Sequence, residues 1–91
     1  MAMAALKIKI LPDNLEADLE KLEEEVRGII EKFGKARLHK VEKEEIAFGL
    51  KALILTIAWP EEIDQYQLEE KLRKIKHVDS VEVIDFRRAV G

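Results

Sequence analysis

The sequence predicts an α+β fold of the ferredoxin-like class, with a four-stranded antiparallel sheet and two helices on one face. The chain has 91 residues, which suffices for one hydrophobic core, so we expect residues 1–91 to form a single domain. Two-residue and helical periodicities follow one another in the order β-α-β-β-α-β. Because β-α-β units cross over right-handed, two such units side by side produce this sheet.

The first half contains a strand and a long amphipathic helix. Leu6–Ile10 alternates apolar residues with lysines, as in a strand with one buried face. Apolar residues then recur at three- and four-residue steps over Leu15–Phe33, which predicts a helix. Asn14 and Asp18 can each serve as its N-cap, and Gly34 ends it.

The second half contains two strands, a short helix and a last strand. Ala36–Ile46 mixes apolar with charged residues, which indicates an edge strand, whereas Leu50–Trp59 is almost entirely apolar, as in a central strand. Apolar positions from Leu68 to Ile75 predict the second helix, and Val78–Ile84 alternates as the final strand. The two most apolar strands, the first and the third, should lie at the centre of the sheet.

Composition excludes several classes of function. Lysine and arginine total 16 against 19 acidic residues, a net charge of −3, which disfavours broad contact with nucleic acid or anionic lipid. The absence of cysteine excludes disulfides and thiolate metal sites. Apolar runs are too short for a membrane span and the N-terminus lacks a secretory signal, so we expect a cytoplasmic protein.

No motif for chemical catalysis, a metal or a cofactor is present. The acidic residues fall mainly on the solvent side of the predicted helices, where nothing would shift a pKa. His39 and His77 lie in different elements, which suits surface histidines better than a metal site. The four glycines are too far apart for a phosphate-binding loop. We therefore expect neither an enzyme nor a cofactor.

An RNA-binding version of this fold would present aromatic residues on the open sheet face of its central strands. The corresponding positions carry Lys7 and Lys9 on one strand, and Ala52, Ile54 and Thr56 on the other. No ring is available for stacking on a base. A metal-carrier version would need paired cysteines. A regulatory domain that binds an amino acid between copies of the fold stays open as an alternative function.

The connection between the second and third strands is unusual because it holds an aromatic residue. Phe48 stands between Ala47 and Gly49 at the predicted turn, where it either folds back over the edge of the core or contacts a partner. Trp59 raises the same question at the other end of the third strand, and there we expect packing in the core.

Two arginines follow the last predicted strand. Arg87 and Arg88 on a short tail can reach a carboxylate or phosphate of another molecule, or they can form a solvated end.

Two stretches give the chain a resemblance to archaeal translation elongation factor 1-beta. The first is Glu45 to Leu53, which reads EIAFGLKAL, and the second is Ser80 to Arg88, which reads SVEVIDFRR. The resemblance covers essentially the whole chain. It departs from the family at Glu45, where many archaeal members have proline.

The resemblance implies a ferredoxin-like fold and a guanine nucleotide exchange factor that acts on GDP-bound elongation factor 1-alpha. It implies that the turn docks on this GTPase, through Ile46, Ala47, Phe48, Gly49, Leu50 and Lys51. In eukaryotic relatives a lysine near the C-terminus reaches toward the magnesium site, and Arg88 best matches it, with Arg87 beside it. Arginine presents a planar fork and not one compact charge, so its action need not be direct displacement of magnesium. We expect a monomer without direct nucleic-acid or membrane partners.

Overall fold

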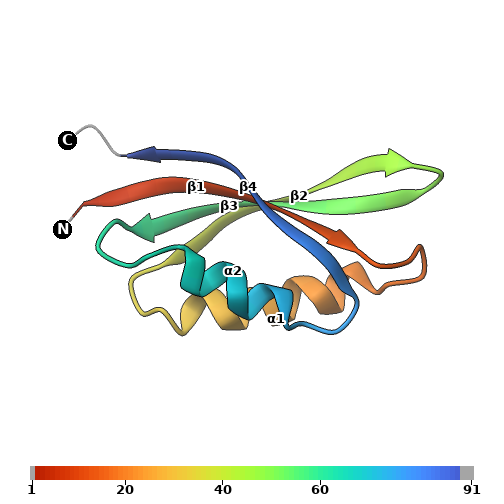
Figure 1. Ribbon diagram of the computed structural model, residues 1–91, viewed down its shortest axis with the longest axis horizontal. Helices are drawn as coiled ribbons and strands as arrows, with labels where there is room; N and C mark the ends of the chain where they lie inside the picture. Colours follow the sequence, from red (N-terminus) through yellow and green to blue (C-terminus); the bar gives the residue numbers. More distant parts are fainter. Residues whose placement is uncertain (1, 89–91) are drawn as a thin grey trace.

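The computed structural model describes residues 2–88 and has the predicted element order (Figure 1). Its elements are β1 (Met3–Pro12), α1 (Leu19–Glu31), β2 (Arg37–Ala47), β3 (Leu50–Pro60), α2 (Tyr66–Arg73) and β4 (Val78–Arg88). No helix within these residues is long and apolar enough to cross a membrane.

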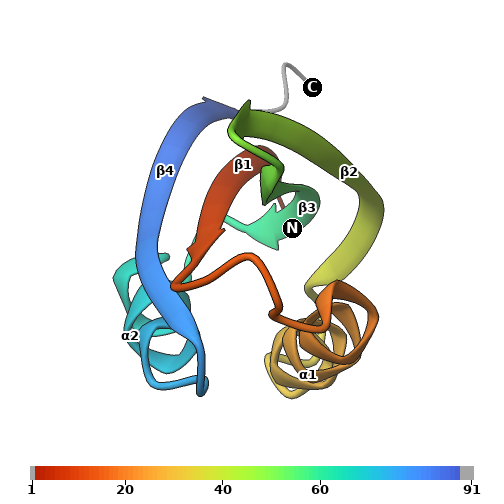
Figure 2. The ribbon, with the colours of Figure 1, turned by 90° about the vertical axis from the view of Figure 1, so that its right-hand side faces the viewer.

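The four strands form one antiparallel sheet in the order β2-β3-β1-β4. Both helices lie side by side on one face of this strongly curved sheet, and the other face is uncovered (Figure 2). The ferredoxin-like prediction is therefore confirmed. So is the prediction that the first and third strands are central, since β1 and β3 pair with each other and each also pairs with one outer strand.

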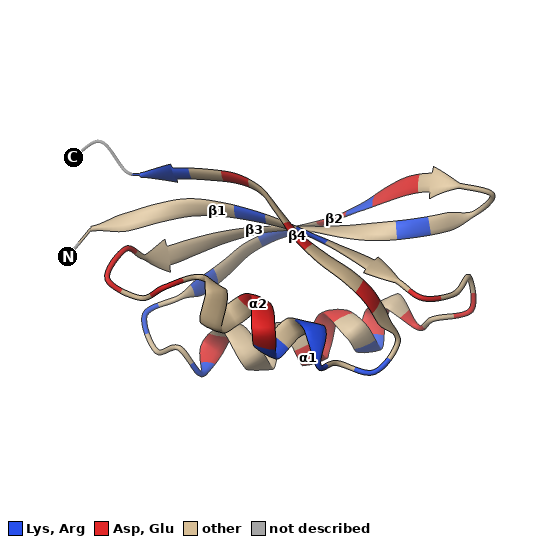
Figure 3. Ribbon diagram, in the orientation of Figure 1, with Lys and Arg blue, Asp and Glu red and all other residues tan. Residues whose placement is uncertain are grey.

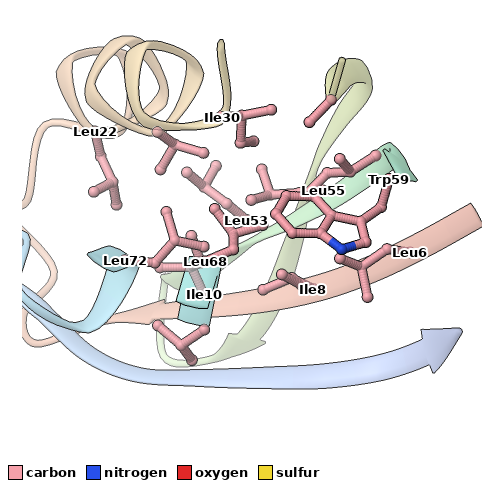
Figure 4. Packing of buried hydrophobic residues seen from close by; sticks show 14 residues of the cluster. Leu6, Ile8, Ile10, Leu22, Ile30, Leu53, Leu55, Trp59, Leu68 and Leu72 are labelled. Atoms are coloured by element: carbon pink, nitrogen blue, oxygen red, sulfur yellow. The ribbon is translucent and has the colours of Figure 1, made fainter. Parts of the chain in front are cut away.

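The core lies between the sheet and the helices (Figure 4). Alternate residues of β1 and β3 point into it, among them Ile8 and Leu55, and each helix contributes one apolar face. Trp59 is fully buried, as predicted: its indole Nε1 donates a hydrogen bond of 2.7 Å to the carbonyl oxygen of Ile63. Its ring centroid lies 5.0 Å from that of Phe33 in a tilted arrangement, a favourable aromatic contact.

Helix α1 uses the later of the two N-caps that the sequence left open. Asp18 is the N-cap, because its Oδ1 accepts hydrogen bonds from the amides of Glu20 at 3.1 Å and Lys21 at 3.2 Å. The assignment of Leu15 to the helix was wrong, since this residue lies in the preceding loop. Asn14 shapes that loop, because its Oδ1 accepts the amide hydrogen of Glu16 at 2.8 Å.

The sheet is longer than predicted at the end where the chain termini lie. Strand β1 begins at Met3, three residues before the expected start, and this extension pairs with both β3 and the last residues of β4. The expected short tail carrying Arg87 and Arg88 was therefore wrong, because both arginines belong to β4. At the second helix the prediction ran too far, since α2 ends at Arg73.

Candidate partner-binding site

The turn between β2 and β3 places Phe48 in a backbone conformation that is unfavourable for phenylalanine. Ala47 pairs with Leu50, so the loop has two residues, and both have positive φ: 50° at Phe48 and 84° at Gly49. Two-residue hairpin turns of this kind favour asparagine or aspartate followed by glycine. Phenylalanine in the left-handed region costs about 1–2 kcal/mol relative to glycine. The turn geometry alone would not select this residue.

Packing does not explain Phe48 either. Its exposed fraction is 97%, so the possibility that it folds back over the core is wrong. Its neighbours are also accessible: Ile46 is 39% exposed, Leu50 is half-buried, and Ala47, Gly49 and Lys51 are exposed. Figure 3 shows that the tip of the hairpin is uncharged and extends past the ends of the helices. An aromatic side chain in this position is free to enter a pocket on another molecule.

The structure adds Leu15 to this surface, a residue that the sequence pattern had placed in the core. Its exposed fraction is 62%, and it lines one cavity of about 220 Å³ together with Gly49 and Lys51. The loop before α1 and the hairpin turn therefore lie next to each other. The helical spacing of Leu15 concealed its exposure, whereas the second possible N-cap, Asp18, was the signal that could have placed Leu15 outside the helix.

Arg87 and Arg88 point to opposite faces of the sheet. Arg88 pairs with buried Ala4, which faces the helices, and Arg87 pairs with exposed Ala5 on the open face. Adjacent residues in a strand always alternate in this way. The two guanidinium groups therefore cannot act together on one phosphate, as an arginine pair on a flexible tail could.

Each arginine already has a carboxylate partner. Arg87 Nε lies 3.0 Å from Asp85 Oδ2, and Arg88 Nε lies 3.3 Å from Glu61 Oε1. Both arginine side chains are about 80% exposed, at 80% and 81%. Ion pairs this exposed contribute roughly 0–1 kcal/mol. An anion of a partner could therefore replace Glu61 at Arg88 at small cost.

The hairpin turn and the arginines lie at opposite ends of the molecule (Figure 1). Arg88 is in register with Ala4, which is in register with Trp59. The nine-residue step from Leu50 to Trp59 along β3 spans roughly 30 Å at the usual strand rise. The longest dimension of the described structure is 42 Å. The predicted docking and effector residues thus lie at separate ends of one continuous sheet.

Within residues 2–88, no cluster of histidine and acidic side chains is suited to a metal ion. Tyr66, exposed on α2, has a hydrogen bond to Glu70 that raises the pKa of its hydroxyl, and the charge of Glu70 adds to the shift. This tyrosine lies on neither surface described above.

The sequence was compared with models of known protein families. The model of the EF-1 guanine nucleotide exchange domain matches residues 5–89, which include both the hairpin turn and the arginines. The chain belongs to this family. The prediction of a guanine nucleotide exchange factor of translation elongation is thereby confirmed.

Individual members of the exchange-domain family are similar over nearly the whole chain. Elongation factor 1-beta of Methanosarcina barkeri is 42% identical over 90 residues, covering 97% of this chain and 99% of its own. The protein of the same name from Pyrobaculum aerophilum is 43% identical over 91 residues, covering 96% of this chain and 95% of its own. Both relatives are archaeal, in agreement with the resemblance noted in the sequence.

Among solved structures, the fold is similar to the ACT domain from GTP pyrophosphokinase of Chlorobium tepidum. The TM-score is 0.64 with 21% sequence identity, over 92% of this chain and 100% of that one. At this identity the likeness concerns the fold alone.

Proposed function

We propose that the whole chain, residues 1–91, acts as one exchange domain that releases GDP from elongation factor 1-alpha during protein synthesis. The observation that carries this proposal beyond the family assignment is Phe48, which is almost fully exposed in a left-handed turn that suits other residues better. We propose that it works as a cytoplasmic monomer and performs no chemistry of its own.

Docking begins at the hairpin turn. Phe48 enters an apolar pocket of the GTPase, and its neighbours in 46–51, together with Leu15, surround it and exclude water. Fully burying an exposed phenylalanine is worth about 1.5–3 kcal/mol, and such aromatic anchors dominate protein interfaces. The turn is preorganised by its two-residue connection, so little loop entropy is lost on binding.

Exchange requires a second contact that weakens nucleotide binding. Magnesium bridges the nucleotide phosphates, so a positive group that disturbs its ligands lowers nucleotide affinity. Arg88 is our candidate for this role, because its exposed guanidinium can leave Glu61 for an acidic ligand of the metal. A tenfold loss of nucleotide affinity requires only about 1.4 kcal/mol of coupling.

The rigid separation of the two ends gives this mechanism a geometric requirement. The GTPase must present an apolar pocket and its nucleotide site roughly 30 Å apart, at the span of β3. Since a continuous sheet joins the two contacts, docking at the turn places Arg88 without a search by a flexible tail.

The test is release of a fluorescent GDP from elongation factor 1-alpha, followed by stopped flow at rising concentrations of the chain. We expect acceleration that saturates, because the chain and the nucleotide weaken each other's binding to the GTPase. No acceleration at a concentration equal to that of the GTPase would refute the proposal.

A further inference from the structure

A shallow groove runs between the two helices, on the side of the helix layer away from the uncovered sheet face. Its volume is about 470 Å³. Ile29 of α1 and Ile75, just after α2, form an apolar floor, and both are half-buried. The groove lies apart from the hairpin turn and from the arginines of β4, so neither part of the proposed exchange mechanism uses it.

The rim of this groove is strongly basic. It is lined by Lys32, Lys71, Lys74 and Lys76, and Glu25 is the one carboxylate among the described residues that line it. None of the four lysines takes part in an ion pair within residues 2–88. The chain as a whole has a net charge of −3, so this concentration of unpaired positive charge is local.

Gly28 is a second, independent observation at the same place. It lies inside α1, where glycine lowers helix stability relative to alanine. A Cβ added at this position would meet no atom within 4 Å, so neither packing nor a close helix contact requires glycine here. Its φ is not in the positive region either. Gly28 leaves the wall of the groove bare, which lets another chain approach the helix closely.

We infer that the groove between α1 and α2 binds an acidic protein segment that carries apolar side chains among its carboxylates. The lysine rim provides charge complementarity, and the two isoleucines accept the apolar side chains. RNA fits less well, because the lining contains no arginine and no aromatic ring on which a base could stack. A two-fold symmetric dimer of this chain fits less well too, since it would bring the same lysines face to face.

The binding test uses a short fluorescein-labelled peptide in which glutamates flank two leucines spaced three residues apart. Fluorescence anisotropy measures its affinity for the full chain, beside a matched peptide with serines in place of the leucines. We expect the leucine peptide to bind at least tenfold more tightly, and its affinity to fall as salt is raised.

Two substitutions locate the peptide on the molecule. Lys74→Glu should weaken binding at least fivefold, while Lys40→Glu on the exposed strand β2, with the same change in net charge, should alter it less than twofold. Gly28→Leu keeps every lysine and should also weaken binding at least fivefold, because its side chain occupies the bare wall. Circular dichroism checks that the variants remain folded, and Lys74→Glu should retain full GDP-release activity.

Several outcomes would overturn the inference. They are an absence of peptide binding, equal binding of the serine peptide, equal or tighter binding of a labelled uridine oligonucleotide at the same groove, and loss of binding in Lys40→Glu. Concentration-dependent dimerisation in light scattering that Lys74→Glu abolishes would assign the groove to a second copy instead. Because no measurement of peptide binding involves the GTPase, failure here leaves the proposed exchange function intact.

Discussion

Replacing Phe48 by asparagine should weaken docking on the GTPase without lowering the stability of the fold. In the free protein this side chain is 97% exposed, so its removal sacrifices no packing. Asparagine tolerates the φ of 50° far better than phenylalanine, and asparagine followed by glycine is a preferred pair in two-residue hairpins. We expect the free energy of unfolding to stay constant or to rise by up to about 1 kcal/mol.

The same substitution should weaken docking on the GTPase. Losing the burial of one phenylalanine in a partner pocket costs about 1.5–3 kcal/mol, which corresponds to roughly a 10- to 150-fold higher half-saturating concentration in the GDP-release assay. The maximal rate at saturation should change much less, because Arg88 is untouched.

Thermal unfolding measures the effect of the substitution on stability. A rise of 1 kcal/mol in the free energy of unfolding would raise the melting temperature by roughly 4–8 °C for a chain of this size.

The matched control is Tyr66→Ala, which removes another exposed aromatic, on α2. Its half-saturating concentration should remain within twofold of the unmodified chain. An unchanged half-saturating concentration for Phe48→Asn would show that the turn does not dock. A melting temperature several degrees lower would show instead that Phe48 supports the fold, which would refute the reasoning from exposure and backbone strain.

Five further substitutions test other parts of the structure. Leu15→Asn should raise the half-saturating concentration about three- to tenfold with little change in melting temperature, if the exposed loop shares the docking surface. Arg88→Ala should lower the maximal GDP-release rate at least tenfold, whereas Arg87→Ala, on the opposite face, should lower it less than threefold; equal effects would contradict the assignment. Gly28→Ala should raise the free energy of unfolding by about 1 kcal/mol in urea denaturation, since its Cβ meets open space. Trp59→Ala should lower it by about 3–5 kcal/mol, because the indole is fully buried and hydrogen-bonded.

Substitution is the right test for the arginines because truncation would do more than remove charge. Among the described residues, Arg87 and Arg88 form the final pairs between β4 and β1, with Ala5 and Ala4. A chain ending before Arg87 would lose these backbone pairs and expose the edge of β1. A fall in exchange rate after truncation would then mix a lost effector with a disturbed sheet.

The fold could be predicted because the apolar residues of each element follow a recognisable pattern, which is alternating in β1 and nearly uninterrupted in β3. Lysines between Leu6, Ile8 and Ile10 indicated a strand with one buried face, and the almost entirely apolar run from Leu50 to Trp59 indicated a strand with neighbours on both sides. These local patterns, together with the handedness of β-α-β units, were enough to determine the strand order.

Boundaries were less predictable, because tertiary contacts set them. Leu15 has the spacing of the helix core, yet Asp18 captures the first helical amides and leaves Leu15 outside. The arginines look like a tail in the sequence, yet Met3–Leu6 offers them a strand to pair with. Hydrogen bonds set both boundaries. The side chain of Asp18 sets the start of α1, and pairing with the distant strand β1 sets the end of β4.

By itself the sequence determined the class of fold, the core, the presence of an aromatic residue in the turn and, by resemblance, the family. Only the tertiary structure decided that Phe48 stands almost fully in solvent, that Arg87 and Arg88 face opposite sides, and that roughly 30 Å of sheet separates the two ends. The reason is physical: hydrophobic patterning specifies which residues leave water, but strand register and pairing specify where the remaining residues point.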